Sequence, residues 1–191
     1  MKIVKNIDID WIRHGFSCAN MLYQLSPNMN LSKLAPNPVL SNYGIQQAKD
    51  TANSILKDYD AILCSNLTRA LETALFMFDD KKIRRKIIIV PYVSEKMGFW
   101  DKIRGIDLEN KPGTLDDLLK SFDKLNRVYD FNIDVDASVI KYFEELNVDL
   151  SPDYDKFVKE ILPIIFSKIK KENRDKSDYY KIAIVSHSNF I

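Results

Sequence analysis

The sequence predicts an α/β protein, a three-layer α/β/α sandwich with a largely parallel central sheet. Short runs with the composition of β-strands alternate along the chain with longer runs of helical periodicity, which is the pattern of this fold class. The strand-like runs at 61–65 and 181–187 are almost entirely apolar, as expected of strands that are covered on both faces. Hydrophobic residues make up 46% of the chain and charged residues 29%, which is typical of a globular domain with a core.

Four runs are predicted strands. They are NIDIDWIR (6–13), AILCS (61–65), KIIIVPYV (86–93) and KIAIVSH (181–187). Pro91 has no N–H group to donate to a strand ladder. The third run is therefore either an edge strand or already leaves the sheet at Pro91.

Four longer segments place apolar residues on one helical stripe. They are residues 41–58, 66–78, 114–126 and 151–172. Ser41 and Thr114 are predicted to begin the first and third helices, and Ser151 followed by Pro152 is predicted to begin the last. Pro163 is expected to kink the last helix.

Two segments do not fit the simple alternation. Residues 21–40 contain three prolines and are predicted to form a long loop. Residues 96–150 are predicted to be a partly helical insertion that packs as a cap over the active-site crevice, because connections of that length are usually functional. Residues 1–191 are otherwise expected to form a single domain.

The composition excludes several classes of protein. The net charge is +1, so we expect neither a nucleic-acid partner nor a membrane partner. The N-terminal residues contain no apolar stretch of the length that a secretory signal needs. Cys18 and Cys64 are too few for a disulfide framework and lack the spacing of metal ligands. We therefore expect a cytoplasmic protein with reduced thiols and without a bound metal or other cofactor.

Polar side chains follow the carboxyl end of each predicted strand, where open α/β sheets bind ligands. They are Arg13 and His14, Ser65 and Arg69, Ser94 and Glu95, and Ser186 and His187. Two arginines and helix N-termini form an anion site, because the planar guanidinium suits phosphate. A neutral imidazole is a nucleophile, a second imidazole can stabilise the transition state, and a carboxylic acid can protonate a leaving alkoxide. This set describes metal-independent phosphoryl transfer through a phosphohistidine.

Five stretches of the chain resemble the sequence blocks of the histidine phosphatase superfamily, which includes the phosphoglycerate mutases. They are RHGFSCAN, LSNYGIQQA, SNLTRALETA, SEKMGFW and IVSHSNFI. The resemblance covers residues 8–100 and 181–191, and the five blocks stand in the family's order. It implies a phosphoglycerate mutase-like α/β/α sandwich.

The resemblance also implies a role for each matching residue. His14 would take the phosphoryl group, and Arg13, Arg69, Asn20 and His187 would bind its oxygens. His187 would also stabilise the transition state. Glu95 would be the proton donor in the Glu-x-x-Gly block, with Asp101 or Asp107 as alternatives.

Departures from the family pattern favour a phosphatase over a mutase. Phe16 stands where many members have an acidic or polar residue, and the Trp- and Gly-rich pieces that mutases carry after the nucleophile are absent. The chain ends four residues after His187, where family members usually continue. We therefore expect either a shortened C-terminal part or an incomplete sequence.

The sequence thus predicts a phosphatase that hydrolyses a phosphate monoester on a small phosphorylated substrate or a phosphoprotein. A phosphoglycerate mutase-type transfer and a non-catalytic phosphate-binding or scaffold domain remain as alternatives. CSNLTR offers a weaker rival, a cysteine-phosphatase loop at Cys64, but it has one residue too few before Arg69 and no glycine. The oligomeric state is not predicted.

Overall fold

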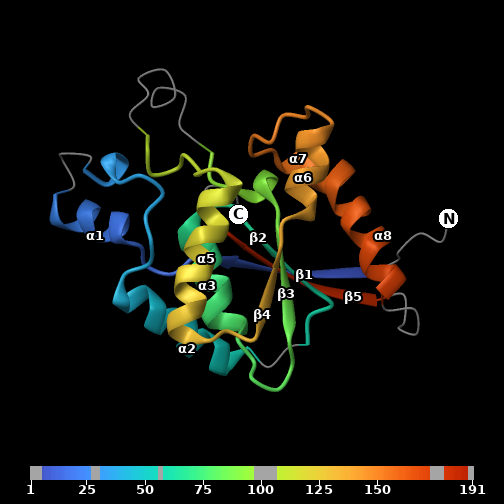
Figure 1. Ribbon diagram of the computed structural model, residues 1–191, viewed down its shortest axis with the longest axis horizontal. Helices are drawn as coiled ribbons and strands as arrows, with labels where there is room; N and C mark the ends of the chain where they lie inside the picture. Colours follow the sequence, from blue (N-terminus) through green and yellow to red (C-terminus); the bar gives the residue numbers. More distant parts are fainter. Residues whose placement is uncertain (1–5, 27–30, 56–57, 97–106, 173–178, 189–191) are drawn as a thin grey trace.

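The computed structural model describes residues 6–26, 31–55, 58–96, 107–172 and 179–188 (Figure 1). The strands of this part of the chain form one parallel sheet of five strands in the order β1-β5-β2-β3-β4. They are β1 (Asn6–Arg13), β2 (Ala61–Cys64), β3 (Arg85–Ile89), β4 (Ile133–Asp136) and β5 (Tyr179–Ser186).

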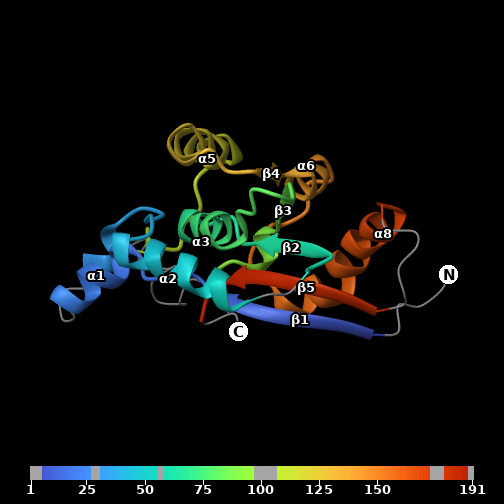
Figure 2. The ribbon, with the colours of Figure 1, turned by 90° about the horizontal axis from the view of Figure 1, so that it is seen from below.

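Helices cover both faces of the sheet. The α-helices are α1 (Cys18–Leu25), α2 (Asn42–Ser54), α3 (Thr68–Phe78), α5 (Leu115–Tyr129), α6 (Ser138–Glu145), α7 (Tyr154–Lys156) and α8 (Leu162–Glu172). Shorter turns are the 3₁₀ segments η2 (Leu31–Leu34) and η3 (Pro91–Val93) and the π-helical segment η4 (Phe157–Ile161). Helices α2, α3 and α5 lie on one face of the sheet, and α6 and α8 lie on the other (Figures 1 and 2). This arrangement confirms the predicted α/β/α sandwich with a parallel sheet.

The strand β5 lies in the middle of the sheet and is buried on both faces. Ala183 and Val185 belong to the core cluster under α2, α3 and α5, whereas Ile182 and Ile184 belong to the cluster under α6 and α8. All four side chains are completely inaccessible to solvent. Burial of a valine or isoleucine side chain contributes roughly 1.5–3 kcal/mol to the free energy of unfolding. This apolar run therefore determines where the strand lies.

The register of the strands aligns their carboxyl ends. Arg13 pairs with Ser186, and Cys64 pairs with Val185. The arrowheads of β2 and β5 point to the same side of the molecule in Figure 2. The residues that follow β1, β2 and β5 are therefore neighbours in space, although they come from both ends of the chain.

Several local predictions are confirmed. Ser41 caps α2 by accepting a hydrogen bond from the Gly44 N–H group, and Thr114 caps α5 in a capping box with Asp117. The strand β3 ends at Ile89, and Pro91 then opens the turn η3. The third predicted strand therefore leaves the sheet at its proline.

Three elements were not predicted. Helix α1 begins at Cys18 and extends into the segment 21–40, which we expected to be a loop. The strand β4 and helix α6 belong to the segment 96–150, and β4 pairs with β3 as an outer strand of the sheet. This segment thus contributes to the sandwich itself, and its role as a cap over the crevice stays a prediction. A four-residue strand with two aspartates gives no apolar run to detect.

The start of the last helical segment differs from the prediction. Asp153 is the N-cap, because its side chain accepts a hydrogen bond from the Lys156 N–H group, while the Ser151 hydroxyl donates to Asp149 instead. The π-helical turn η4 directly precedes α8, in which Pro163 is the second residue. A proline lacks its N–H group and clashes with the carbonyl four residues earlier, so a departure from α-helical geometry here has a physical cause.

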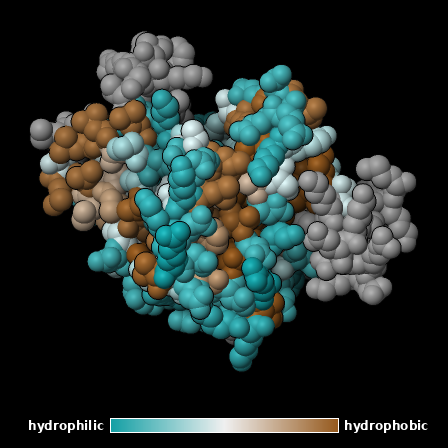
Figure 3. Space-filling model, in the orientation of Figure 1, coloured by the Kyte–Doolittle hydropathy of each residue, from teal (hydrophilic) through white to brown (hydrophobic). Residues whose placement is uncertain are grey.

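Hydrophobic surface is visible over α1 (Figure 3), where Met21 and Leu25 are exposed. Within the described ranges, no helix is both long enough and apolar enough to cross a lipid bilayer.

Candidate active site

His14 follows β1 and is held at the edge of the sheet. Its backbone N–H group donates to the Ser186 carbonyl oxygen at 3.0 Å, which continues the ladder beyond Arg13. Its Nδ1 atom lies 2.7 Å from the Gly15 carbonyl oxygen. A carbonyl oxygen only accepts hydrogen bonds, so the ring proton is on Nδ1. The lone pair of the neutral ring is then on Nε2, which accepts a hydrogen bond from Arg69 Nε at 3.2 Å.

Arg69 is the second residue of α3, and its side chain is almost completely buried. Besides the bond to His14, one terminal nitrogen donates to the Glu109 carbonyl oxygen at 2.9 Å and the other to Asn110 Oδ1 at 2.7 Å. A guanidinium group has five N–H donors, so these three bonds leave two for an anion. A buried cation at a helix N-terminus, where the helix dipole disfavours positive charge, favours the binding of an anion.

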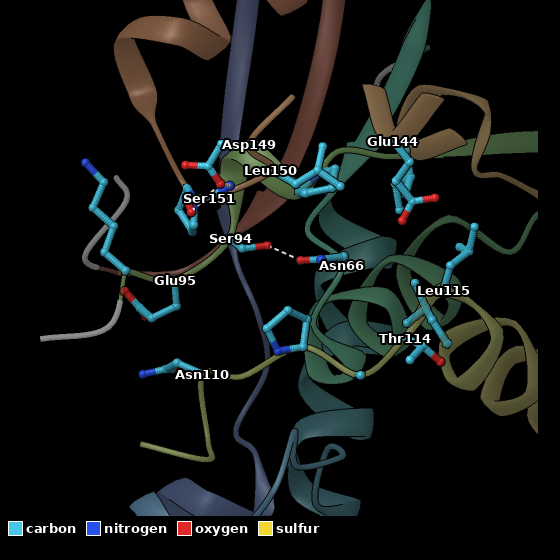
Figure 4. A pocket seen from close by; sticks show the side chains of 17 residues that line it. Asn66, Ser94, Glu95, Asn110, Thr114, Leu115, Glu144, Asp149, Leu150 and Ser151 are labelled. Atoms are coloured by element: carbon cyan, nitrogen blue, oxygen red, sulfur yellow. Dashed lines mark hydrogen bonds between the residues drawn. The ribbon is translucent and has the colours of Figure 1, made fainter. Parts of the chain in front are cut away.

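His187 follows β5 and has no exposed surface. The centroid of its ring lies 5.0 Å from that of His14, so the two histidines form one site. Its Nε2 atom lies 2.9 Å from Ser65 Oγ, which in turn lies 2.8 Å from Ser94 Oγ. Ser94 Oγ donates to Asn66 Oδ1, the bond drawn in Figure 4. These residues link His187 to the ends of two other strands.

The direction of this hydrogen-bond chain assigns the tautomer of His187. Asn66 Oδ1 only accepts, so the Ser94 hydroxyl donates to it, and the Ser94 oxygen accepts from the Ser65 hydroxyl. The Ser65 oxygen is then left to accept from the His187 Nε2–H group. His187 is therefore neutral with its proton on Nε2, and its Nδ1 atom carries the lone pair.

Burial and nearby cations keep both rings neutral. Burial, followed by the positive charge of Arg69, lowers the pKa of His14 to about 3, although the Gly15 bond acts in the opposite direction. Burial, again followed by Arg69, also lowers the pKa of His187. A neutral His14 with an unprotonated Nε2 atom is the form that a nucleophile requires.

Glu95 is the carboxyl group that the structure brings to the histidines. It is buried, and its Oε2 atom lies 4.0 Å from His187 Nδ1. Asp107 is also buried, but it accepts hydrogen bonds from the backbone and side-chain nitrogens of Asn110 at 3.2 and 3.0 Å. Asp107 thus orients Asn110, which accepts a hydrogen bond from Arg69. Asp101 lies outside the described residues.

Arg13 and Asn20 approach His14 from the other side. All three line a cavity of about 380 Å³. Arg13 is exposed, and its charge contributes to the lowered pKa values of both histidines. Asn20 Oδ1 accepts from the Ser17 N–H group in the capping box of α1, which leaves the amide N–H donors of Asn20 available for an anion.

Sequence reasoning missed three side chains that hold the site together. The sequence indicates Ser65 only as a polar residue at the end of a strand, and it gives no reason to select Asn110. Thr73 accepts from the Gly15 N–H group at 3.0 Å and donates to the Arg69 carbonyl oxygen at 2.7 Å. Thr73 and Asn110 gave no signal, because a polar residue in a helix or loop is ordinary until its partner is known.

The rival site at Cys64 is not supported. Cys64 has no exposed surface, and burial raises the pKa of its thiol. A thiol must be deprotonated to act as a nucleophile, so this cysteine is an interior strand residue.

A larger cavity of about 600 Å³ opens beside Glu95. Glu95 and Asn110 lie at one side of it, and Thr114, Leu115 and Glu144 lie at the opposite side (Figure 4). Asn110, which lines this cavity, also accepts a hydrogen bond from Arg69, so the cavity borders the residues around His14.

The structure thus places two histidines together at the carboxyl ends of the strands of a parallel α/β/α sandwich. The family model of the histidine phosphatase superfamily (branch 1) matches residues 11–127, which is more than half of the chain. The chain therefore belongs to the histidine phosphatase superfamily. The matched range includes Arg13, His14, Arg69 and Glu95, whereas His187 lies beyond it and joins the site through the fold.

Several solved structures show a weak likeness to this chain. One is a candidate α-ribazole-5'-P phosphatase from Escherichia coli, with 20% identity, 97% of this chain and 76% of that chain covered and a TM-score of 0.48. A phosphoserine phosphatase from Entamoeba histolytica, in complex with 3-phosphoglyceric acid, has 22% identity, coverages of 96% and 75% and a TM-score of 0.42. The ecdysone phosphate phosphatase of Bombix mori, in complex with tungstate, has 13% identity, coverages of 94% and 72% and a TM-score of 0.46. Likenesses this weak imply nothing about the fold, the reaction or the substrate of this chain. Among curated protein sequences, none matches this chain.

Proposed function

We propose that this protein hydrolyses a phosphate monoester through a phosphohistidine at His14. The observation that carries the proposal is the Nε2 atom of His14. It bears a lone pair in a neutral ring and accepts a hydrogen bond from the buried guanidinium of Arg69, and the ring of a second buried histidine has its centroid 5.0 Å away. A site that only binds phosphate needs cations and N–H donors but no unprotonated imidazole.

The phosphoryl group would bind beside the two histidines, within reach of both rings. The two unused N–H donors of Arg69, the exposed guanidinium of Arg13 and the amide of Asn20 would bind its oxygens. The negative charge of the phosphate would oppose the effect of burial and raise the pKa of His187. His187 Nδ1 would then gain a proton and donate a hydrogen bond to a phosphoryl oxygen.

Hydrolysis would take two steps. In the first, the Nε2 lone pair of His14 attacks phosphorus, the bond from phosphorus to the ester oxygen breaks, and Glu95 gives its proton to that oxygen. In the second, water attacks the phosphohistidine, its proton passes to Glu95, and the P–N bond breaks. Inorganic phosphate leaves, and His14 returns to its neutral state.

A phosphoenzyme experiment tests this mechanism. Wild-type protein incubated with a ³²P-labelled aryl phosphate and quenched in alkali should carry a label that is stable to base and labile to acid, as a phosphohistidine is. His14→Gln should carry no label, and its turnover should fall by at least about 1,000-fold. An unchanged melting temperature would show that the variant is folded.

Other outcomes separate the alternatives. A His14→Gln protein that hydrolyses the ester at the wild-type rate would overturn the nucleophile. Conversion of a phosphoglycerate to its isomer, without release of phosphate, would identify a mutase. Phosphate affinity without any turnover would identify a binding domain. Because no step uses a metal ion, a chelator should leave the rate unchanged, and loss of activity in chelator would contradict the mechanism.

A further inference from the structure

The cavity beside Glu95 lies where the leaving group of the ester must go. His14, the proposed nucleophile, lines the 380 Å³ cavity with Arg13 and Asn20. Glu95, the proposed acid, lines the separate cavity of about 600 Å³. In an in-line displacement the nucleophile and the leaving oxygen are on opposite sides of phosphorus. The organic part of the substrate would therefore extend past Glu95 into the larger cavity.

The lining of this cavity is mostly apolar. Leu115 and Leu118 of α5, Ile140 of α6 and Leu150 contribute hydrocarbon surface. The volume of about 600 Å³ falls within the range of small-molecule sites, which are typically apolar with a few polar groups. A hydrocarbon or aromatic leaving group would bury apolar surface here.

The charges around the cavity are mainly negative. Glu144 and Asp149 are exposed at its rim, whereas Glu95, buried in its wall, would be protonated and neutral before the first step. Among the described lining residues Lys96 is the one cation, and it directly follows Glu95 in the chain. Lys156 Nζ donates to the Asp149 carbonyl oxygen and offsets part of the charge of Asp149. A second anionic group on the leaving group would therefore meet repulsion, most clearly at Glu144.

We propose that the cavity between Glu95 and Glu144 is a leaving-group subsite for an apolar organic group that carries no negative charge. This inference rests on the proposed phosphatase activity and narrows its substrate class. It disfavours esters whose leaving group bears a carboxylate or a second phosphate.

Matched ligands test the subsite without turnover. The 4-(carbamoylmethyl)benzyl and 4-(carboxymethyl)benzyl phosphonates have nearly the same shape and differ in one charge. Calorimetry at pH 7.5 should show about fivefold or tighter binding of the carbamoyl compound, because like charges repel weakly at a partly exposed rim. Methylphosphonate, which places nothing in the cavity, should bind at least about tenfold more weakly than the carbamoyl compound.

Two neighbouring carboxylates provide a matched pair of variants. Glu144 lines the cavity, whereas Glu145 is the next residue of α6 and does not line it. Glu144→Lys should strengthen binding of the carboxymethyl compound by about tenfold, and Glu145→Lys, with the same change in net charge, by less than about twofold. Equal effects of both variants would overturn the proposal.

Turnover of the corresponding phenyl phosphates separates the two proposals. The carbamoylmethyl and carboxymethyl esters have leaving groups of similar acidity, because a methylene insulates the charge from the ring. Selective phosphonate binding without hydrolysis of either ester would refute the phosphatase and support the subsite. Hydrolysis of both esters, with equal phosphonate affinities, would refute the subsite and support the phosphatase. If none of the phosphonates binds more tightly than methylphosphonate, the subsite is wrong.

Discussion

Single hydrogen bonds give the two histidines opposite tautomers. The Gly15 carbonyl oxygen holds the proton of His14 on Nδ1, and the Ser65 hydroxyl holds the proton of His187 on Nε2. The two lone pairs are therefore on different atoms, Nε2 of His14 and Nδ1 of His187. The first faces Arg69, and the second lies 4.0 Å from a carboxylate oxygen of Glu95. In the proposed mechanism, the first ring would attack phosphorus and the second would receive a proton.

The chain contains only two histidines, so NMR can test this assignment directly. Long-range ¹H–¹⁵N spectra at pH 7 should show one ring protonated on Nδ1 and one on Nε2. Because the pKa of His14 is about 3 and that of His187 is also lowered, neither ring should titrate between pH 8 and pH 5. His14→Gln and His187→Gln assign the signals.

Ser65→Ala is the discriminating variant in the same experiment. It removes the acceptor for His187 Nε2–H, so the signals of His187 should change while those of His14 stay in place. Ser121→Ala, which removes a solvent-exposed hydrogen bond on α5, should change neither. Two rings that titrate near pH 6.5, or that share one tautomer, would contradict the assignment.

Among the elements, the packing of α2 against the loop after β1 positions His14, the proposed nucleophile. Ser41, the N-cap of α2, donates its hydroxyl to the Phe16 carbonyl oxygen at 2.8 Å. Gly15 and Gly44 bring the two backbones close together. A Cβ atom at Gly44 would lie 2.2 Å from the Phe16 carbonyl oxygen, and one at Gly15 would lie 2.6 Å from the Gly44 carbonyl oxygen. Both glycines serve this close approach, since no side chain fits between the backbones.

Replacing Gly44 by alanine should therefore force α2 away from the loop that carries His14. We expect the free energy of unfolding to fall by about 2 kcal/mol or more, and kcat/KM for an aryl phosphate to fall as well. Urea denaturation and steady-state kinetics measure the two effects. Asn53→Ala, at an exposed position of the same helix, should change stability by less than about 0.5 kcal/mol. Equal stabilities of the two variants would contradict the proposed contact.

For the whole molecule, buried ionisable groups make stability depend on pH in opposite directions. Burial raises the pKa of Glu72 from 4.5 to about 7, although the hydrogen bond that its Oε2 accepts from the Leu40 N–H group acts against this. The folded state thus binds this proton more tightly than the unfolded chain. The resulting stabilisation is fully present below about pH 4.5 and is lost as the pH rises to about 7. His14 acts the other way, since its folded pKa is lowered and its contribution is lost as the pH falls from 6.5 toward 3.

Glu72→Gln isolates the carboxyl contribution, because glutamine keeps an acceptor for Leu40 and cannot ionise. As the pH rises from 5 to 8, the free energy of unfolding of the variant should increase by on the order of 3 kcal/mol relative to that of wild type. This figure follows from 1.36 kcal/mol for each unit by which burial raises the pKa of Glu72. The histidine contributions cancel in this comparison. Guanidinium denaturation at both pH values measures it, with exposed Glu145→Gln as the control. Parallel pH profiles of wild type and Glu72→Gln would show that Glu72 is not perturbed.

Much of this architecture could be predicted because it follows from local chemistry. The apolar run of β5, the capping residues Ser41 and Thr114, and the break at Pro91 each act within a few residues. The strand β4 could not be predicted. Its sequence IDVD has no strong apolar pattern, and its pairing with β3 depends on a partner more than 40 residues away.

The sequence by itself determined the fold class, the family and the residue types of the site, because periodicity and strand-end motifs are local patterns. Only the tertiary structure decided which atoms meet. The register of β5 between β1 and β2 brings His187 within 5.0 Å of His14, and the Ser65–Ser94–Asn66 chain assigns the tautomer of His187. The partners of Arg69 and the cavity beside Glu95 come from residues distant in the chain. Hydrogen-bond direction and burial depend on such partners, and no local pattern encodes them.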